Sequence, residues 1–497
     1  MSRPLLTPPH MQTIVVVHSL QDWPFKVPDI QAVTASSYLT SPEWIAARGV
    51  RVVNLCRTYA YQGEGYYVSL LASGRNHRPF PDLRTVLDMK NRHRVRTVDE
   101  ELDALIQKSL SDIQASEFDL SIYFGKNLAQ RHSRLAQRLF GLFPVPLQRA
   151  HFVKGRRWRV TSIAPIATRD VPETHRAFVA EAAHGYLSRP RRHARKQVGA
   201  SYDLGILYDP NEELAPSDGK ALARFRRAAR HVGFDVQMLQ KDDYARVAEF
   251  DAIFLRETTA VDHHTFRIAQ RAEAAGVIVI DDTTSILRST NKVFQAETLS
   301  KHNVRIPNTF ITNEADAQAI IAKVGLPCVL KHPDSSFSQG VFKCSTPEET
   351  VSKAKAILEQ SDLLVAQEYL PTGFDWRIGT FAGEVLYACR YEMAKGHWQI
   401  AKRTKAGKMQ YGKVEPIALE QVPPEVIKQA KRAAAAFGDS LYGVDLKTVD
   451  NQVYVTEVND NPNIDGGCED ALLGDELYRR IMQGMLDRVL ARKERLS

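Results

Sequence analysis

The stretch that decides the expected fold is Tyr442-Gly-Val-Asp-Leu-Lys-Thr-Val-Asp-Asn-Gln-Val-Tyr-Val-Thr-Glu-Val-Asn-Asp-Asn-Pro-Asn463. Its two apolar runs, Val444–Thr448 and Val453–Val458, have the length and the β-branched content of strands. The Asp450-Asn451 pair between them suits a tight turn. The stretch therefore predicts a β-hairpin that leads into a polar loop.

Polar side chains of this hairpin are expected to meet on one face. Alternate residues of a strand share a face, so Glu457 and Asn459 point the same way, and Asp445 lies on the neighbouring strand. Carboxylate and amide oxygens are ligands that suit Mg²⁺, which also keeps waters and binds substrate phosphates. A polar face turned to solvent is the competing interpretation, but it does not explain why the run 459–463 is so dense in oxygen-bearing side chains. We therefore predict a metal site at Asp445, Glu457 and Asn459.

Two lysines upstream are candidate phosphate ligands. Lys292 opens a predicted helix, and Lys331 ends the apolar strand Pro327–Lys331. A lysine at the end of a buried strand can face a cleft, where its charge serves a phosphate; either one alone would more often be a surface cation. The loop 334–340 offers backbone N–H groups to phosphate, and the strand 363–370 offers backbone groups to an adenine ring edge.

The order of predicted elements divides the chain. Residues 202–285 alternate strands with helices, which is typical of a parallel sheet; the expected strands are 203–208, 234–238, 251–255 and 277–280, and the expected helices are 218–232 and 265–275. From 286 onward short strands pair in an antiparallel manner with interspersed helices, which predicts an α+β domain. In the first 185 residues only strands near 13–18, 50–55 and 121–124 and a helix at 97–110 stand out.

Length, cysteine content and net charge limit the class of protein to which the chain can belong. A chain of 497 residues suggests about three domains, and no apolar run is long enough to cross a membrane. Five scattered cysteines without a paired motif favour free thiols in a reducing compartment, so a cytoplasmic location is expected. The net charge of +8 is compatible with an anionic substrate, a nucleic acid or an ordinary solvated surface. The basic run 187–196 favours a linker, since no aromatic residues are interleaved with it as base stacking would require.

Taken together, the C-terminal segments resemble the RimK-like branch of the ATP-grasp superfamily. The resemblance covers about 200–492, and residues 1–150, including Gly65–Leu71, more loosely resemble the N-terminal domain of such proteins. It rests on motifs in a fixed order: Ile280–Lys292, Val329–Lys331, Val365–Leu370, Asp375–Arg377, Arg390, Gly443–Asp445 and Glu457–Asn459. The expected domains are an N-terminal α/β domain at 1–185, a basic linker at 186–201, a small parallel-sheet domain at 202–288 and a two-subdomain ATP-grasp fold at 289–497.

The resemblance implies an ATP- and Mg²⁺-dependent ligase (Mn²⁺ being an alternative metal) that activates a carboxylate as an acyl phosphate and joins it to an amine. It implies metal ligands at Asp445, Glu457 and Asn459, phosphate contacts at Lys292 and Lys331, adenine or ribose contacts at Gln367, Glu368, Leu370 and Asp375, and a catalytic role for Arg390 at the transferred phosphate together with Lys331 and Arg377. Arg256 and Arg377 are candidates to grip substrate carboxylates, with structural ion pairing as the alternative, and Asn461 is a further candidate substrate contact.

Substrates and assembly stay open. The phosphate loop is less glycine-rich than in relatives, and 401–408 is more basic, so both departures put the substrate in doubt. Small amino acids or peptides are the expected substrates, with a protein tail as the alternative acceptor and a non-catalytic scaffold that binds ATP or nucleic acid as the competing class. A homo-oligomer is expected, a membrane partner is not, and a nucleic-acid partner is disfavoured.

Overall fold

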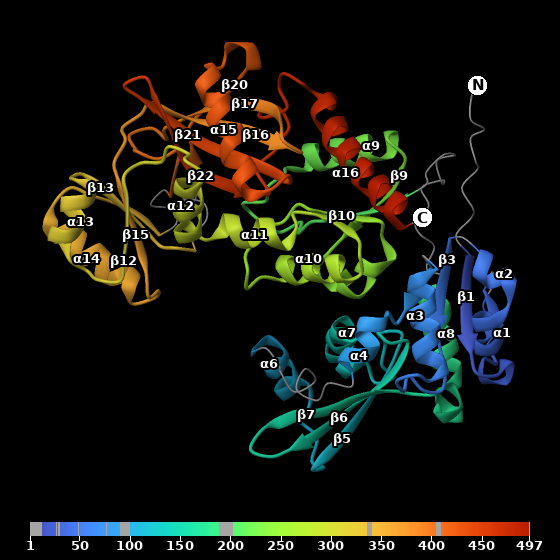
Figure 1. Ribbon diagram of the computed structural model, residues 1–497. Coiled ribbons are helices and arrows are strands. Elements are labelled where there is room, and N and C mark those ends of the chain that lie inside the picture. Colours follow the sequence, from blue (N-terminus) through green and yellow to red (C-terminus); the bar gives the residue numbers. More distant parts are fainter. Residues whose placement is uncertain are drawn as a thin grey trace, which may run out of the picture. The chain divides into compact units, whose positions relative to one another are not determined.

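The computed structural model describes residues 12–25, 27, 30–47, 49–75, 77–89, 100–187, 202–334, 340–403 and 409–496, and Figure 1 shows their secondary structure. The described chain divides into two compact units, one from Met1–Ser201 with Asp242–Glu249 and Leu496–Ser497, the other from Tyr202–Lys241 with Phe250–Arg495. The predicted basic linker from 188 onward, most of the predicted phosphate loop and residues 404–408 lie outside the described residues.

The first unit contains a parallel sheet and an antiparallel one. The parallel sheet has the order β2-β1-β3-β4, and the antiparallel sheet has the order β5-β6-β7. Its strands are β1 (Gln12–Val17), β2 (Gln31–Thr34), β3 (Val50–Asn54), β4 (Arg78–Phe80), β5 (Glu117–Tyr123), β6 (Leu147–Lys154) and β7 (Trp158–Pro165). Its α-helices are α1 (Ala35–Thr40), α2 (Pro42–Ala46), α3 (Glu64–Gly74), α4 (Leu83–Asp88), α6 (Glu100–Ser109), α7 (Ser133–Leu142) and α8 (Arg176–Leu187). The predicted strands at 13–18, 50–55 and 121–124 fall on β1, β3 and β5.

The second unit begins with the predicted parallel sheet. Its strands β8 (Tyr202–Leu207), β9 (Phe234–Leu239), β10 (Ala252–Leu255) and β11 (Ile278–Ile280) pair in the order β11-β10-β8-β9. Helix α9 (Gly219–His231) begins at Asp218, whose carboxylate accepts a hydrogen bond from Ala221 N, and α10 (His264–Ala274) precedes β11. Because the chain leaves β8 in one direction and β10 in the other, the loops after these two strands flank a topological switch point, where open α/β sheets bind ligands.

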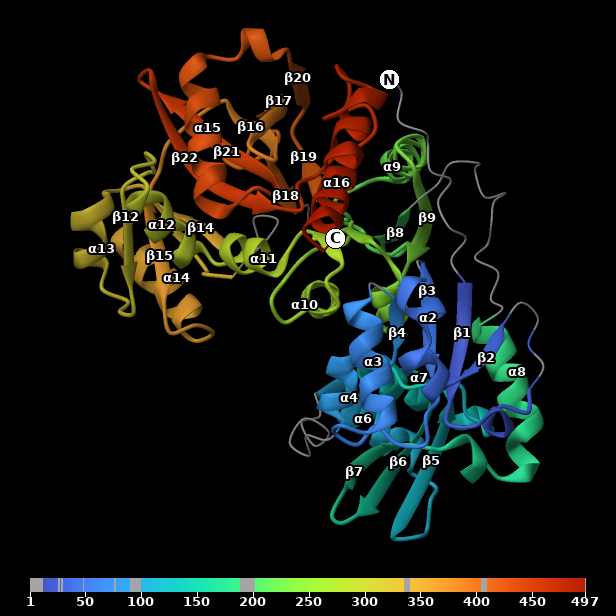
Figure 2. The same cartoon turned by 45° about the vertical axis from the view of Figure 1, so that its right-hand side comes forward.

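A four-stranded antiparallel sheet follows, in the order β12-β15-β13-β14. Its strands are β12 (Thr309–Thr312), β13 (Cys328–Lys331), β14 (Val341–Cys344) and β15 (Leu364–Glu368). Helices α13 (Ala317–Val324) and α14 (Pro347–Leu358) lie together on one side of it in Figures 1 and 2, where they bury Ile320, Ile357 and the inward side chains of the strands. Helices α11 (Thr283–Thr290) and α12 (Lys292–Lys301) connect this sheet to the parallel one.

The last sheet has the order β20-β17-β16-β21-β22. Its strands are β16 (Phe374–Phe381), β17 (Glu384–Glu392), β20 (Val414–Ile417), β21 (Leu441–Val449) and β22 (Gln452–Asp460), with a small hairpin of β18 (Ala401–Arg403) and β19 (Met409–Tyr411) beside them. Helix α15 (Pro424–Phe437) covers one face, and α16 (Asp475–Leu496) packs against α9, where Tyr478 meets Phe225 at a ring distance of 4.6 Å. Asp450 and Asn451 of the predicted turn both have positive φ.

The state of the cysteines and the hydropathy of the helices were also predicted from the sequence. All five cysteines are free thiols, four of them buried. Within the described ranges, no helix combines the length and the apolar character needed to cross a bilayer.

Candidate active site

A cavity of about 1310 Å³ opens in the second unit, where its three larger sheets converge. The floor comes from β16, β21 and β22, one wall from the sheet of β13 and β15, and another wall from the loops that follow β8 and β10. These two loops, 213–216 and 258–262, leave the topological switch point of the parallel sheet. The cavity therefore lies where the fold alone would place a ligand.

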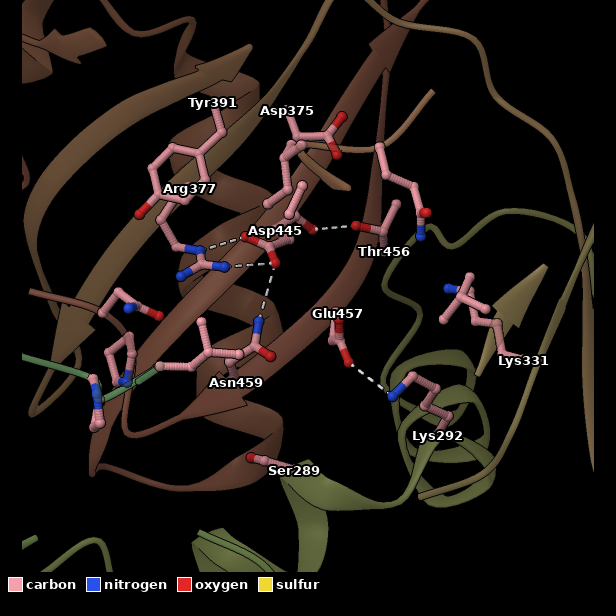
Figure 3. A pocket seen from close by; sticks show the side chains of 18 of the residues that line it. Ser289, Lys292, Lys331, Asp375, Arg377, Tyr391, Asp445, Thr456, Glu457 and Asn459 are labelled. Carbon is pink, nitrogen blue, oxygen red and sulfur yellow. Dashed lines mark hydrogen bonds and ion pairs between the residues drawn. The ribbon is translucent and has the colours of Figure 1, made fainter. Parts of the chain in front are cut away.

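The floor carries the predicted metal ligands together. In Figure 3, Asp445, Glu457 and Asn459 turn to the same side of the hairpin of β21 and β22. Register explains this: Asp445 stands opposite Glu457, because Thr456 forms a one-residue bulge in β22. Arg377 donates from both Nε and Nη2 to the Asp445 carboxylate, the second bond measuring 2.9 Å, and Asn459 Nδ2 donates to Asp445 Oδ2 over 3.0 Å. The structure thus places two carboxylates, one amide and one guanidinium on one face of the sheet, with Asp445 bound to both Arg377 and Asn459.

Lysines surround these carboxylates. Lys292, at the first turn of α12, is 8% exposed, and its Nζ lies 3.2 Å from Glu457 Oε1. Lys331 ends β13 and lines the same cavity (Figure 3). Lys447, two residues beyond Asp445 on the same strand face, donates to Thr372 Oγ1 over 2.8 Å and to the carboxylate of Asp375. Cations and acids therefore alternate along the floor.

Burial and charge shift the ionisation of this cluster. Burial lowers the pKa of the Lys331 amine to about 8, and nearby Lys292 adds to the effect while Glu457 opposes it. Burial would raise the pKa of Glu457, but the neighbouring Lys292 and Lys331 outweigh it, so the pKa of this carboxyl lies below its usual range. At neutral pH the floor therefore holds a charged Glu457 beside a lysine whose charge is easily perturbed.

The residues predicted to border adenine lie along one wall. Gln367 and Glu368 end β15, and both line the cavity with Tyr369 and Leu370. Gln367 is held by a 2.9 Å hydrogen bond from its Nε2 to Thr309 Oγ1, and the Glu368 carboxylate accepts from the backbone N and the side-chain amide of Asn308, both over 2.9 Å. The side chains are thus used to fix the strand end, which leaves backbone groups to face the cavity.

Arg390, predicted to act at the transferred phosphate, is not among the described residues that line the cavity. It stands opposite Trp376 in the register of β16 and β17, on the face that packs under α15. Its guanidinium lies 4.9 Å from the Trp376 ring centroid and 4.8 Å from that of Phe374. Arg377, which neighbours Trp376 on β16, occupies the cavity face instead, and the role of Arg390 at the transferred phosphate stays a prediction.

The side chains of Arg256 and Asn461, the two other candidate substrate contacts, are hydrogen-bonded within the protein. Arg256 is 1% exposed and donates to Ser217 Oγ, to Asn461 Oδ1 over 2.8 Å and to Pro462 O over 2.9 Å. Asn461 Nδ2 in turn donates to Glu257 O. Asn461 lines the cavity, and both ends of its amide are bound internally. Contact of either residue with a substrate stays a prediction.

Sequence reasoning missed several lining residues. Lys447 could have been found, because it lies two residues after Asp445 and strand residues alternate faces. Tyr391 could not have been found from the sequence, because a β-bulge decides which face of the sheet it occupies. The loops 213–216 and 258–262 could not have been found either, because they carry no recognisable motif.

Comparison with known protein families identifies the class of enzyme. Residues 289–476 match the RimK-like ATP-grasp domain, and residues 35–182 match the RimK-like ATP-grasp N-terminal domain. The chain thus contains both domains of RimK-like ATP-grasp proteins. It is accordingly an ATP-dependent ligase that forms C–N bonds.

Individual relatives are distant. A protein of Pseudomonas putida named probable alpha-L-glutamate ligase is 27% identical over 221 residues, which is 44% of this chain and 70% of that protein. Probable alpha-L-glutamate ligase 1 of Shewanella denitrificans is 27% identical over 222 residues, 44% of this chain and 72% of that protein. Among solved structures, D-alanine–D-alanine ligase of Bacillus anthracis has a TM-score of 0.46 at 15% identity, covering 59% of this chain and 99% of the other.

Proposed function

We propose that this ATP-grasp ligase uses ATP and Mg²⁺ to activate the carboxylate of a small substrate and joins it to an amine of an amino acid or peptide-like acceptor. The observation that supports this most is the floor of the cavity, where Asp445, Glu457 and Asn459 lie among Lys292 and Lys331. Oxygen ligands beside phosphate-binding cations are what phosphoryl transfer requires of a protein.

The residues present fit a magnesium ion in their chemistry. Within the described ranges no group of three or more His, Cys, Asp or Glu side chains forms a metal cage, so the donors would be two carboxylates and the Asn459 amide oxygen. Such a small protein set is usual for Mg²⁺, which retains waters and substrate phosphate oxygens. Glu457 forms an ion pair with Lys292, whereas Asp445 is held by two hydrogen bonds from Arg377, so we place the main ligand role on Glu457. When bound, the ion would supply charge neutralisation at the phosphates.

The protein's own groups then have defined tasks. Lys292 and Lys331 hold the phosphate chain of ATP, and the backbone of 367–370 borders the base. A substrate carboxylate oxygen attacks the γ-phosphorus, the bond from that phosphorus to the β,γ-bridging oxygen breaks, and ADP leaves with the electron pair. Arg377, fixed by Asp445, faces the new acyl phosphate; the amine then attacks the acyl carbon, the acyl C–O bond breaks, phosphate departs and the nitrogen loses a proton. Exclusion of water by the cavity walls would protect the acyl phosphate from hydrolysis.

The test is ADP release from the full chain with a panel of carboxylates and amines. Glu457→Gln should abolish release, by at least about 100-fold, because it removes the charged metal ligand without changing shape. Glu415→Gln is the matched control, since this carboxylate lies on β20 and has its ion pair with Arg390, away from the cavity. If ADP release in Glu457→Gln equals that in Glu415→Gln, the proposed site is wrong.

A further inference from the structure

The two parts of the chain carry opposite formal charges. Residues 1–201, which form most of the first unit, contain 29 lysines and arginines against 16 aspartates and glutamates, a formal charge of +13. Residues 202–497 contain 37 against 42, a formal charge of −5. The net charge of +8 therefore arises in the part of the chain that contributes no described residue to the cavity. A charge asymmetry of this size is typical of proteins that bind a polyanion.

The type of cation narrows the kind of partner. Residues 1–201 contain 23 arginines and 6 lysines, whereas residues 202–497 contain 19 arginines and 18 lysines. Either residue would serve to solvate a surface, and the second part of the same chain shows no preference between them. The planar guanidinium binds phosphate oxygens in a bidentate manner and is the preferred cation for nucleic-acid recognition. The arginine excess thus favours a partner with phosphate groups over an ordinary solvated surface.

The densest group of cations in the described part of the first unit is the turn Lys154–Arg159 between β6 and β7. Four of its six residues are cations, and all four are exposed: Lys154, Arg156, Arg157 and Arg159. Arg157 pairs with Asp103 over 2.7 Å but keeps 63% of its side chain exposed. For the other three, no ion pair with an acid is found among the described residues. The turn thus presents a concentrated positive charge to solvent.

The fold holds this turn in place. Trp158 alternates with the cations and is 3% exposed. Gln107 of α6 binds its backbone from both sides, since Gln107 Nε2 donates to Trp158 O over 2.8 Å and Gln107 Oε1 accepts from Trp158 N over 3.0 Å. Lys154 Nζ donates to Ile113 O over 3.1 Å. The backbone of the turn is therefore ordered before a ligand binds, which lowers the entropic cost of binding.

The acids of the same sheet lie on its other edge. Glu117 and Asp119 belong to β5, which is separated from β7 by β6, and Asp119 is paired with His151 over 2.7 Å. In Figures 1 and 2 the hairpin of β6 and β7 extends away from the parallel sheet of its unit. A two-stranded β-ribbon fits a nucleic-acid groove, and cations at its end can reach the phosphates that flank the groove.

We infer that the first unit binds the phosphate backbone of a nucleic acid, with the turn Lys154–Arg159 as its main contact. The contact is to phosphates rather than to bases, because Trp158 is buried and the turn has no other aromatic ring on which a base could stack. The lack of aromatic residues in 187–196 disfavours base stacking there, but phosphate contacts do not need it. This binding goes beyond the proposed ligase reaction and does not depend on it.

The test is binding of the full chain to fluorescein-labelled RNA and DNA duplexes, measured by fluorescence anisotropy between about 0.05 and 0.2 M salt. Phosphate contacts without base readout should give a Kd of roughly 1–100 μM at about 0.15 M salt, and log Kd should rise steeply with log salt. Binding to either duplex supports the inference, and the tighter complex identifies the preferred polymer. Absence of binding to both duplexes at the lowest salt would overturn it. So would competition by poly-L-glutamate at equal charge concentration, because the site would then be one for acidic polypeptides.

A triple variant locates the contact. Lys154→Gln/Arg156→Gln/Arg159→Gln removes three exposed charges and leaves Trp158 and its bonds to Gln107 in place. It should raise the Kd at least about 10-fold and reduce the slope of log Kd against log salt by about 2–3, because each lost phosphate contact lowers this slope by about 0.9. The single variant Arg156→Gln should reduce the slope by about 1. An unchanged slope in both variants refutes the assigned turn.

The matched control removes the same number of charges from the second unit. Lys428→Gln/Lys431→Gln/Arg432→Gln changes three exposed cations of α15 and should bind both duplexes like the wild type. Equal weakening in the two triple variants would show that net charge alone matters and would refute the turn as the contact. Both triples should keep the melting temperature of the wild type, which excludes misfolding as the cause. No turnover is measured, so these outcomes are independent of the Glu457→Gln test of the proposed function.

Discussion

Replacing Arg256 with Met should unfold the second unit more readily rather than weaken substrate binding. The side chain leaves β10 and connects two loops far apart in sequence, through Ser217 and through the carbonyl of Pro462. Its guanidinium lies 5.3 Å from the Phe254 ring centroid. Burial lowers the pKa of Arg256 to about 10, which still leaves it charged at neutral pH.

The magnitude follows from these contacts. Hydrogen bonds from a charged donor contribute about 1.5–3 kcal/mol each, but those of one side chain are not additive, and removing one member of a buried charged network costs about 3–5 kcal/mol. Met keeps the apolar contact with Phe254, so we expect a loss of about 3–5 kcal/mol in the free energy of unfolding. Arg227→Met is the matched control: this arginine is 65% exposed and pairs with Asp475, so its loss should cost at most about 1 kcal/mol.

The assay is urea unfolding followed by hydrogen exchange and mass spectrometry, so that peptides of the second unit report separately from those of the first. The segments 216–217 and 461–464 should lose protection first in Arg256→Met. Suppose instead that the free energy of unfolding changes by less than about 1 kcal/mol while the KM for the carboxylate substrate rises. Arg256 would then be a substrate ligand, and the structural role assigned to it would be refuted.

Three further outcomes test the floor of the cavity. The pKa of Lys331 is about 8 in the free protein, and bound phosphate would raise it, so below about pH 8 the lysine is charged both with and without ATP. As the pH rises above about 8, the free protein loses this charge, and the Kd for ATP should increase. In Lys331→Arg the Kd should not change over this pH range. Arg390→Gln should change ADP release by no more than roughly twofold, whereas Arg377→Gln should lower it strongly. A Cβ at Gly443 would lie 2.7 Å from Pro462 Cβ and 3.0 Å from Arg377 Cδ, so Gly443→Ala should lower the melting temperature and ADP release together, by about 1–3 kcal/mol in stability.

The parallel-sheet domain was predictable because its signals are local. Strands such as 251–255 are short apolar runs, and α9 begins where Asp218 can cap it, one residue later than the expected start. Each of these signals lies within about fifteen residues, so no tertiary information was needed. The part of the cavity lining that comes from the loops 213–216 and 258–262 was not predictable, because these loops meet the other sheets only after the chain has folded.

Strand faces in the last sheet depend on bulges, which leave no mark in a single sequence. From the turn at Asp450 and Asn451, a regular ladder would set Asp445 opposite Thr456 and would turn Glu457 to the core. The bulge at Thr456 sets Asp445 opposite Glu457 instead, and so brings the two carboxylates together. A one-residue shift exchanges the two faces of every later side chain, so this single irregularity builds the floor.

The same physics removes Arg390 from the site. From the turn at Ala382 and Gly383, a regular hairpin would place Arg390 opposite Asp375, beside the cavity, as its position in the motif suggested. The register shifts between Gly379 and Thr380, where Leu386 is the extra residue, so Arg390 stands opposite Trp376 and Tyr391 takes the cavity face. Tyr391 is the residue that binds Glu469, so the bulge that withdraws a guanidinium also supplies a hydroxyl to the Glu469 carboxylate. One inserted residue thus exchanges a guanidinium for a phenol at this position of the cavity lining.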